Sequence, residues 1–277
     1  MHITLHHAAA RHPSARAAAP AAVHGLNLGL AKGEQVAVIG PSGAGKTSLL
    51  HVLACALPPS AGSLALDGQN PWQLRTRALQ RLRGQLFLAP QVPPLPPRQR
   101  VVTSVLAGRL PHQSLWASLR SLAYPSDIPL ADRCLGEFDL SEKLFERVDR
   151  LSGGERQRVA LARALASQAM LWLVDEPLSA LDPARSQQAL QTLTQAARAR
   201  GVTLVVTLHH VEMALAHFPR ILGLRLGEVV FDLPTDQVTP AKLLQLYEQK
   251  GQDIPWQEPD SADISPLPAP PVAVQCR

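Results

Sequence analysis

Cysteine and aromatic residues are scarce in this sequence of 277 residues, which has three cysteines and 4% Phe, Trp and Tyr. Cys55, Cys134 and Cys276 lie far apart and match no metal-ligand spacing, so we expect free thiols in a reducing compartment. No run of about 18 uncharged apolar residues occurs, and we therefore expect no membrane-spanning helix. These two absences argue against a disulfide-rich secreted domain and against an integral membrane protein.

Long runs of basic residues are absent as well. The net charge of +5 and the pI near 9.5 permit attraction to nucleic acid or to anionic lipid headgroups. However, no run of five or more Lys and Arg occurs and aromatic side chains are few, which favours a mildly basic surface and no nucleic-acid partner. Residues 1–33 lack acidic side chains, as transit peptides do, but their strand-like alternation favours a place within the fold.

Short apolar runs that alternate with helical segments indicate the architecture. Strands and helices of these lengths predict a mainly parallel sheet covered on both faces. Residues 101–150 have helical spacing without a strong strand and are predicted to be a helical insert. Residues 251–277, rich in Pro, Asp, Glu and Ser, are predicted to be a disordered tail. The predicted strands include 35–40, 85–90, 170–177 and 202–210, and the predicted helices span 46–57, 74–83, 184–199 and about 240–250.

The segment GPSGAGKT, residues 40–47, fits the pattern G-x(4)-G-K-[ST] between a predicted strand and a predicted helix. Its glycines let backbone N–H groups approach phosphate oxygens, and the helix that follows supplies partial positive charge at its N-terminus. Lys46 places an ammonium group near the terminal phosphates, and the Thr47 hydroxyl is a ligand for Mg²⁺. The residues expected to bind nucleotide here are Gly40, Pro41, Ser42, Gly43, Ala44, Gly45, Lys46, Thr47 and Ser48.

Two carboxylates close the apolar run MLWLVDEP at residues 170–177. Alongside a phosphate loop, this arrangement aims Asp175 at a metal ion and Glu176 at an attacking water. Gln91 and His209 also follow predicted strands. The amide oxygen of Gln91 is a candidate metal ligand, and the imidazole of His209 is a candidate contact to the γ-phosphate. Each of these two residues, considered alone, is more typical of an exposed strand end.

A second anion-binding pattern occurs at LSGGERQR, residues 151–158. Ser152 and Glu155 have the S-x-x-E spacing of a capping box, and an apolar-periodic helix follows. A capping box requires no glycine, and Gly153 and Gly154 disfavour a helix start unless the backbone must approach another group closely. The helix N-terminus is therefore a second candidate phosphate site.

In this order, the motifs resemble those of ATP-binding cassette (ABC) ATPase subunits, over about residues 2–250. The resemblance rests on the motifs at 40–47, 91, 151–155, 175–176, 179–182 and 209. It implies the α/β P-loop NTPase fold of ABC ATPases, with a mainly parallel sheet core, an antiparallel β subdomain and a helical subdomain. The implied parts are the first half of the nucleotide-binding core with the β subdomain (1–92), the helical subdomain with the signature motif (93–165), the second half of the core (166–250) and the tail (251–277).

The resemblance also implies a role for each motif residue, with ATP and Mg²⁺ as cofactors. Glu176 resembles the general base and His209 the switch histidine, which we prefer to His210 because it directly follows the apolar residue at 208. The implied metal ligands are Thr47, Gln91 and Asp175. The implied contacts to nucleotide held by a second copy of the chain are Ser152, Gly153 and Gly154, with Asp182 coupling the two sites.

One departure from the family pattern concerns adenine. The family usually places an aromatic residue, often Tyr, before the first pair of strands, whereas the matching stretch ARHPSA has His12 there. Stacking of a base on an aromatic ring contributes about 1–3 kcal/mol, and an imidazole stacks less well than a phenol. We therefore expect weaker nucleotide binding if His12 is the adenine platform, and the alternative is a plain surface histidine.

Two segments, 104–127 and 209–234, resemble the ATPases of phosphonate importers. The resemblance implies a subunit that hydrolyses ATP to energise import of phosphonate or a related phosphorus oxyanion, and an importer of a different solute is the alternative. A non-transport ABC ATPase would need a long coiled coil before LSGGE or a second cassette, and the sequence has neither.

The implied partners are a second copy in an ATP-sandwich dimer, two transmembrane permease subunits that contact residues 92–125, and indirectly a solute-binding protein. The implied location is peripheral, on the cytoplasmic face of the inner (cell) membrane.

Overall fold

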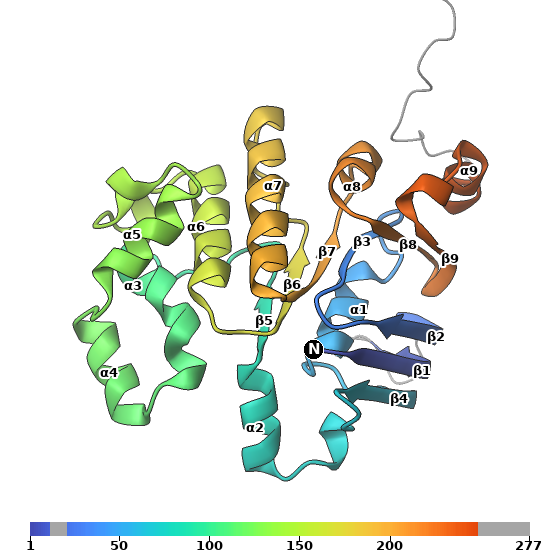
Figure 1. Ribbon diagram of the computed structural model, residues 1–277, viewed down its shortest axis with the longest axis horizontal. Helices are drawn as coiled ribbons and strands as arrows, with labels where there is room; N and C mark the ends of the chain where they lie inside the picture. Colours follow the sequence, from blue (N-terminus) through green and yellow to red (C-terminus); the bar gives the residue numbers. More distant parts are fainter. Residues whose placement is uncertain (12–20, 249–277) are drawn as a thin grey trace, which may run out of the picture.

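A six-stranded sheet forms the centre of the molecule, in the order β5-β6-β7-β3-β8-β9 (Figure 1). The computed structural model describes residues 1–11 and 21–248. All pairings are parallel except that of β9 with β8, which confirms the mainly parallel sheet. The strands are β3 (Gln35–Ile39), β5 (Leu86–Ala89), β6 (Leu171–Asp175), β7 (Thr203–Thr207), β8 (Arg220–Arg225) and β9 (Glu228–Pro234).

A separate three-stranded sheet, ordered β2-β1-β4, is antiparallel throughout and confirms the implied β subdomain. Its strands are β1 (Ile3–Ala10), β2 (Val23–Leu30) and β4 (Ala61–Leu66). A turn follows β4, and in it Asp67 and Gly68 have φ values of 46° and 78°. Asp and Gly adopt this left-handed region more readily than branched residues do.

The helical insert lies beyond β5, at one end of the large sheet (Figure 1). Its helices α3 and α5 contact α6, which leads back into the sheet. The α-helices here are α3 (Val101–Leu106), α4 (Leu115–Ala123), α5 (Ile128–Gly136) and α6 (Gly153–Ala166), with 3-10 helices at Ala107–His112, Ser141–Lys143 and Val148–Arg150. The division of the chain at residues 92, 165 and 250 stays a prediction.

The remaining helices follow strands of the two sheets. The helix predicted over 46–57 ends at Leu53, because Cys55 has a φ of 54° and its carbonyl accepts a hydrogen bond from Arg83 at 2.7 Å. α8 was not expected from the sequence. These helices are α1 (Lys46–Leu53), α2 (Thr76–Gly84), α7 (Pro183–Arg200), α8 (Val211–His217) and α9 (Pro240–Tyr247), with 3-10 helices at Pro71–Gln73 and Thr235–Gln237.

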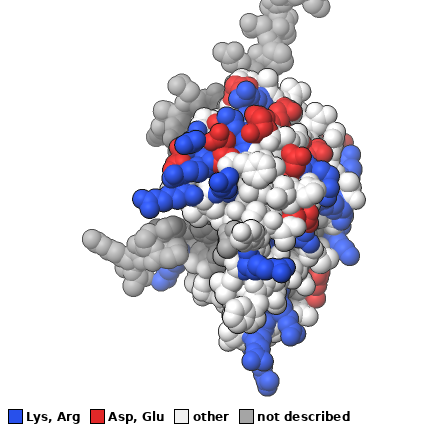
Figure 2. Space-filling model, turned by 90° about the vertical axis from the view of Figure 1, so that its left-hand side faces the viewer, with Lys and Arg blue, Asp and Glu red and all other residues white. Residues whose placement is uncertain are grey.

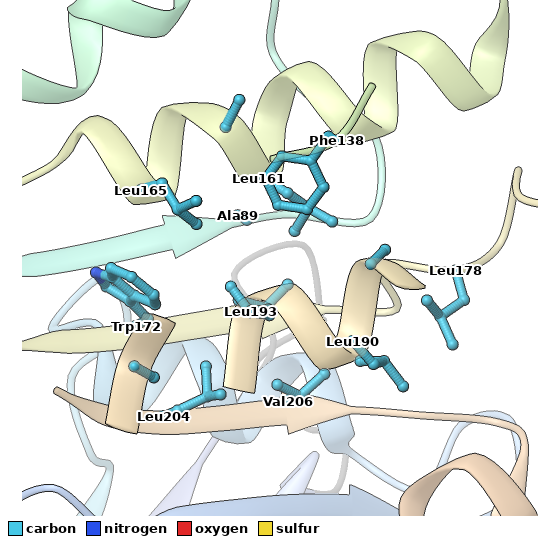
Figure 3. Close-up of a cluster of buried hydrophobic side chains, with 14 of the residues drawn as sticks. Ala89, Phe138, Leu161, Leu165, Trp172, Leu178, Leu190, Leu193, Leu204 and Val206 are labelled. Carbon is cyan, nitrogen blue, oxygen red and sulfur yellow. The ribbon is translucent and has the colours of Figure 1, made fainter. Parts of the chain in front are cut away.

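Buried apolar side chains form two clusters on opposite faces of the large sheet. Alternate residues of a strand contribute to each cluster: Trp172 and Val174 of β6 to one, and Leu171 and Leu173 to the other. The first cluster joins the sheet to the helical insert and to α7 (Figure 3). The second joins the sheet to α1 and to the antiparallel sheet. The helical insert and the β subdomain therefore both pack against the large sheet.

Two further expectations concern thiols and membrane spans. Cys55 and Cys134 are buried and free, as predicted, and Cys276 lies outside the described residues. Burial raises the pKa of the Cys55 thiol to about 11, and it also raises the pKa of the Cys134 thiol. Within the described ranges, no helix is both long enough and apolar enough to cross a bilayer.

Two phenylalanines near the helical insert provide a matched test of this core. Phe138 is 1% exposed, whereas Phe145 is 56% exposed. We expect Phe138→Ala to lower the free energy of unfolding by about 3–5 kcal/mol, because it leaves a cavity between the insert and the sheet. Phe145→Ala is the control and should change it by about 0.5 kcal/mol or less. Urea unfolding measures both, and equal losses would contradict this account of the core.

Candidate active site

The predicted phosphate loop connects the end of β3 to the start of α1, in the middle of the large sheet. Gly40 opens the loop with a φ of 153°. A Cβ atom at this position would lie 2.0 Å from the carbonyl oxygen of Leu224 in β8, a distance at which a side chain cannot fit. The glycine therefore lets the loop press against β8, which holds its backbone in a fixed orientation.

A cavity of about 340 Å³ lies at the N-terminus of α1. It brings together five segments that are distant in the sequence, four of which we expected at the site. The first turn of α1 has no acidic side chain, so its free N–H groups favour an anion in this cavity. The lining residues are Ala22, Ser42, Gly43, Ala44, Gly45, Lys46, Thr47, Ser48, Gln91, Glu176 and His209.

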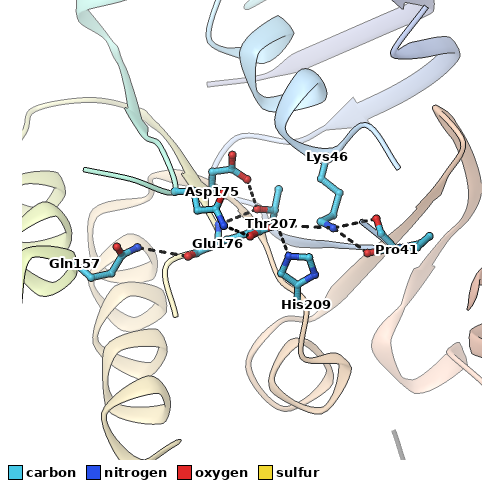
Figure 4. Close-up of polar contacts among 9 residues, drawn as sticks. Pro41, Lys46, Gln157, Asp175, Glu176, Thr207 and His209 are labelled. Carbon is cyan, nitrogen blue, oxygen red and sulfur yellow. Dashed lines mark hydrogen bonds and ion pairs between the residues drawn. The ribbon is translucent and has the colours of Figure 1, made fainter. Parts of the chain in front are cut away.

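Lys46 lies almost entirely buried beside this cavity, with 5% of its side chain exposed. Its Nζ donates to the carbonyl oxygens of Gly40 at 2.9 Å and Pro41 at 3.3 Å (Figure 4). It also lies 3.9 Å from Oε1 of Glu176. Burial lowers the pKa of Lys46, and the nearby carboxylates of Glu176 and Asp175 oppose that effect. The ammonium group is thus held at the site by neutral acceptors and one weakly placed carboxylate.

Glu176 has the largest number of polar contacts at the site (Figure 4). Its Oε1 lies 2.5 Å from Nε2 of His209, and its Oε2 accepts a hydrogen bond from Nε2 of Gln91 at 2.7 Å. Its φ of 46° is uncommon for a residue with a side chain. The backbone is held there by Thr207, whose Oγ1 accepts from the Glu176 N–H at 2.9 Å, and by Gln157, which donates to the Glu176 carbonyl at 3.4 Å.

Asp175 is 4% exposed and does not line the cavity. Its Oδ1 accepts a hydrogen bond from the Thr207 hydroxyl at 2.6 Å. Thr207 is fully buried at the end of β7, directly opposite Asp175 in the strand pairing. One hydroxyl therefore holds both Asp175 and the backbone of Glu176.

Sequence reasoning missed Thr207, Gln157 and Ala22 at this site. In the sequence, Thr207 is a hydroxyl residue at the end of an apolar strand. This position indicates a contact to Asp175 only once β7 is known to pair with β6. His210, the alternative to His209, is the residue before α8 and does not line the cavity.

Ser152, Gly153 and Gly154 stand at the start of α6, and they do not line the cavity of their own chain. The capping box is present: the Ser152 Oγ accepts from the Glu155 N–H at 3.2 Å, and Glu155 Oε2 accepts from the Ser152 N–H at 2.7 Å. A Cβ atom on Gly154 would lie 2.8 Å from the carbonyl oxygen of Ala180. Gly154 is thus required by a contact within its own chain. The sequence led us to expect only a contact to nucleotide held by a second copy.

Of the other two predicted site residues, Asp182 belongs to the described residues and does not line the cavity. Asp182 caps α7, where its Oδ1 accepts from the Arg185 N–H at 3.0 Å, and this bond lowers the pKa of Asp182. Its role in coupling two sites stays a prediction. His12, the candidate adenine platform, lies outside the described residues.

Comparison with known proteins gives the same family as the motifs. Residues 23–179 match the family model for the ABC transporter. The phosphonates import ATP-binding protein PhnC 2 of Albidiferax ferrireducens is 65% identical over 277 residues, which is 100% of both chains. The corresponding protein of a Polaromonas species is 64% identical over 100% of both chains, and that of Pseudomonas entomophila is 51% identical over 92% of this chain and 95% of its own.

Solved structures show the same fold. A bacterial ABC transporter cassette solved as a dimer aligns with a TM-score of 0.72 at 27% identity, covering 84% of this chain and 98% of its own. A dimeric ATP-binding cassette in a post-hydrolysis state, bound to ADP and Pi, aligns with a TM-score of 0.71 at 26% identity and the same coverage.

Thr207→Val tests the hydroxyl that holds the two carboxylate residues. The valine keeps the shape of the threonine but leaves a buried oxygen of Asp175 and the N–H of Glu176 without this partner. We expect the free energy of unfolding to fall by about 1–3 kcal/mol for these unsatisfied groups. Thr194→Val is the control, because the buried Thr194 hydroxyl donates only to carbonyls of its own helix. Similar losses in the two variants, measured by urea unfolding, would contradict a special role for Thr207.

Proposed function

The chain belongs to the ABC transporter family, and we propose that it is the ATP-hydrolysing subunit that energises import of phosphonate or a related phosphorus oxyanion. The observation that carries the proposal is the cavity in which the loop at 40–48 faces Glu176 and His209. It places phosphate-binding groups and a carboxylate in one site, which is the combination that ATP hydrolysis requires. The relatives at 51–65% identity are named phosphonates import ATP-binding proteins, which supports phosphonate as the solute class.

The nucleotide phosphates fit the groups at the N-terminus of α1. The loop supplies backbone N–H groups, and the Lys46 ammonium contacts only neutral carbonyl oxygens at hydrogen-bond distance in the free chain. A charged phosphate oxygen is a stronger acceptor than a carbonyl, so Lys46 can exchange these contacts for contacts to the β- and γ-phosphates. Thr47 and Ser48 add hydroxyls at the same edge of the cavity.

The side chains near the phosphates also fit Mg²⁺, which prefers oxygen ligands and retains several waters. The Thr47 hydroxyl and the Gln91 amide oxygen belong to residues that line the cavity. Asp175 lies behind them with one oxygen bound to Thr207, so we assign it a contact through water. Bound Mg²⁺ would neutralise charge that develops between the β- and γ-phosphates.

Glu176 is the general base in this proposal. A base must lie within hydrogen-bond reach of the proton that it accepts, and in the free chain both oxygens of Glu176 are already occupied. In this role Oε2 of Glu176, which accepts from Gln91, would take the proton of the attacking water, while the amide oxygen of Gln91 would remain available to Mg²⁺. His209 contacts Oε1, and we assign it a contact to the γ-phosphate.

A complete site requires a second copy of the chain. The N-terminus of α6, with Ser152, Gly153 and Gly154, offers N–H groups to an anion but does not line the cavity of its own chain. One similar cassette is a dimer in two of its solved structures. We therefore assign each ATP to the loop of one copy and the signature segment of the other, with Asp182 between the two sites.

The partners and the location follow from the import role. The dimer would contact two permease subunits through residues 92–125, and a solute-binding protein would supply the solute from outside. The chain would then lie on the cytoplasmic face of the cell membrane as a peripheral subunit. ATP shifts the open and closed dimer only by its different affinity for the two forms.

Glu176→Gln should lower the ATPase rate by roughly 10²–10⁴-fold, because the amide cannot accept the proton of the attacking water. ATP binding should persist, and the variant should accumulate as a dimer in MgATP. The matched control is Glu212→Gln, the same substitution at an exposed position in α8. Phosphate release and size-exclusion chromatography measure the two effects. Undiminished turnover of the Glu176 variant would overturn the assignment of the base.

The solute class is tested on the complete transporter in vesicles. We expect a phosphonate, presented with the solute-binding protein, to stimulate ATP hydrolysis more strongly than sulfate does. Stimulation by an unrelated solute alone would overturn the phosphonate assignment while leaving the ATPase in place. No hydrolysis under any condition would overturn the proposed function as a whole.

A further inference from the structure

The N-terminus of α6 combines two opposite electrostatic properties. The capping box uses the N–H groups of Ser152 and Glu155 as donors, so the N–H groups of Gly153 and Gly154 can receive an anion. The same box places the carboxylate of Glu155 at this end of the helix. A carboxylate there stabilises the helix, but it repels any other anion that approaches the same N–H groups. The segment that we assign to ATP held by a second copy therefore contains a negative charge of its own.

The carboxylate of Glu155 remains ionised at neutral pH. Its Oε2 accepts from the Ser152 N–H at 2.7 Å, and this bond lowers the pKa of Glu155. The positive charges of Lys143 and Arg158 act on that pKa in the same direction. Protonation therefore does not remove the repulsion, and a nearby cation must offset it when a phosphate approaches.

Lys143 is the cation best placed to offset this charge. It belongs to the 3-10 helix Ser141–Lys143, and its Nζ lies 3.8 Å from Oε1 of Glu155. That distance is too long for a hydrogen bond, so the ammonium group balances the charge without drawing the carboxylate out of the capping box. The Lys143 side chain is 34% exposed, whereas Arg158 is 6% exposed and donates to the carbonyl oxygen of Phe138 at 2.6 Å. Lys143 is thus the cation on the side of Glu155 that another molecule can reach.

Ion pairs are common on the helical insert, and the pair of Lys143 with Glu155 differs from a neighbouring pair of similar length. Figure 2 shows basic and acidic side chains mixed over the upper part of the side that carries the insert. Arg150 and Glu146 are 3.7 Å apart, and neither takes part in the capping box of α6. The two pairs therefore allow the effect of an ion pair in general to be separated from an effect on the anion site.

We propose that Lys143 is a positioning residue for the nucleotide held by a second copy of the chain. Its ammonium group neutralises Glu155, so that the N–H groups of Gly153 and Gly154 can receive the γ-phosphate across the dimer. The inference rests on the proposed function, because it concerns the second half of the same ATP site. It assigns to the helical insert a charge balance that sets how tightly the dimer closes on ATP.

Dimer formation by the Glu176→Gln variant tests the proposal, because that variant should retain bound MgATP. In this background, Lys143→Gln should weaken MgATP-dependent dimerisation about two- to fivefold, which is the effect expected of a partly exposed ion pair. Sedimentation equilibrium measures the dimerisation constant. The affinity of the single chain for a fluorescent ATP analogue, measured below the concentration at which dimers form, should stay unchanged because the phosphate loop is intact. A general loss of structure would lower both quantities.

Removal of the opposing charge should rescue the Lys143 variant. Glu155→Gln removes the negative charge, but its amide oxygen can still accept from the Ser152 N–H. In that background, Lys143→Gln should cause no further loss of dimerisation, because no charge remains to offset. Lys143→Arg keeps the positive charge and should keep the dimerisation constant. A loss that persists alongside Glu155→Gln would mean that Lys143 contacts the phosphate itself, and it would overturn the charge balance.

Arg150→Gln is the matched control, because it removes a cation from the neighbouring pair with Glu146. It should leave the dimerisation constant unchanged. An equal loss in the control would overturn the inference, and so would an unchanged constant for Lys143→Gln while the Glu176→Gln parent dimerises. If the parent variant neither binds ATP nor dimerises, the proposed function itself is wrong.

Discussion

The parallel pairing of β7 with both β3 and β6 is the constraint on which the candidate site depends. Val38 of β3 pairs with Thr207, and Thr207 pairs with Asp175 of β6. The carboxyl ends of the three strands therefore meet at one edge of the sheet, where ligands of open α/β sheets bind. A shift of one residue in β7 would turn the Thr207 side chain to the other face and leave Asp175 and the Glu176 backbone without that partner.

The polar contacts around Glu176 join segments that are distant in the sequence. Lys46, Gln91 and His209 come from three different segments, and all lie against the same carboxylate. This carboxylate gives each of these side chains a polar partner, which offsets the cost of burying them. The signature segment stands outside the cavity.

The chain connects this site directly to helices α2, α3 and α4. α2 leads directly into β5, β5 ends near Gln91, and the segment after Gln91 enters α3 and then α4. The hydrophobic core is continuous between the large sheet and the helical insert, because residues of β5, α3 and α6 belong to one cluster of buried side chains. A displacement of the outer helices therefore acts on Gln91 through packed elements rather than through a flexible connection.

The sequence by itself determined the features that depend on near neighbours. These are the phosphate loop between a strand and a helix, the capping box of Ser152 and Glu155, the carboxylates that end β6, and the helical insert. Only the tertiary structure decided how Thr207 holds Asp175, 32 positions away, and which oxygen of Glu176 contacts Gln91 or His209. No pattern in the sequence indicated the close approach of Gly154 to Ala180. The reason is physical: local patterns follow from backbone periodicity, whereas these contacts depend on strand order and register, which join distant residues.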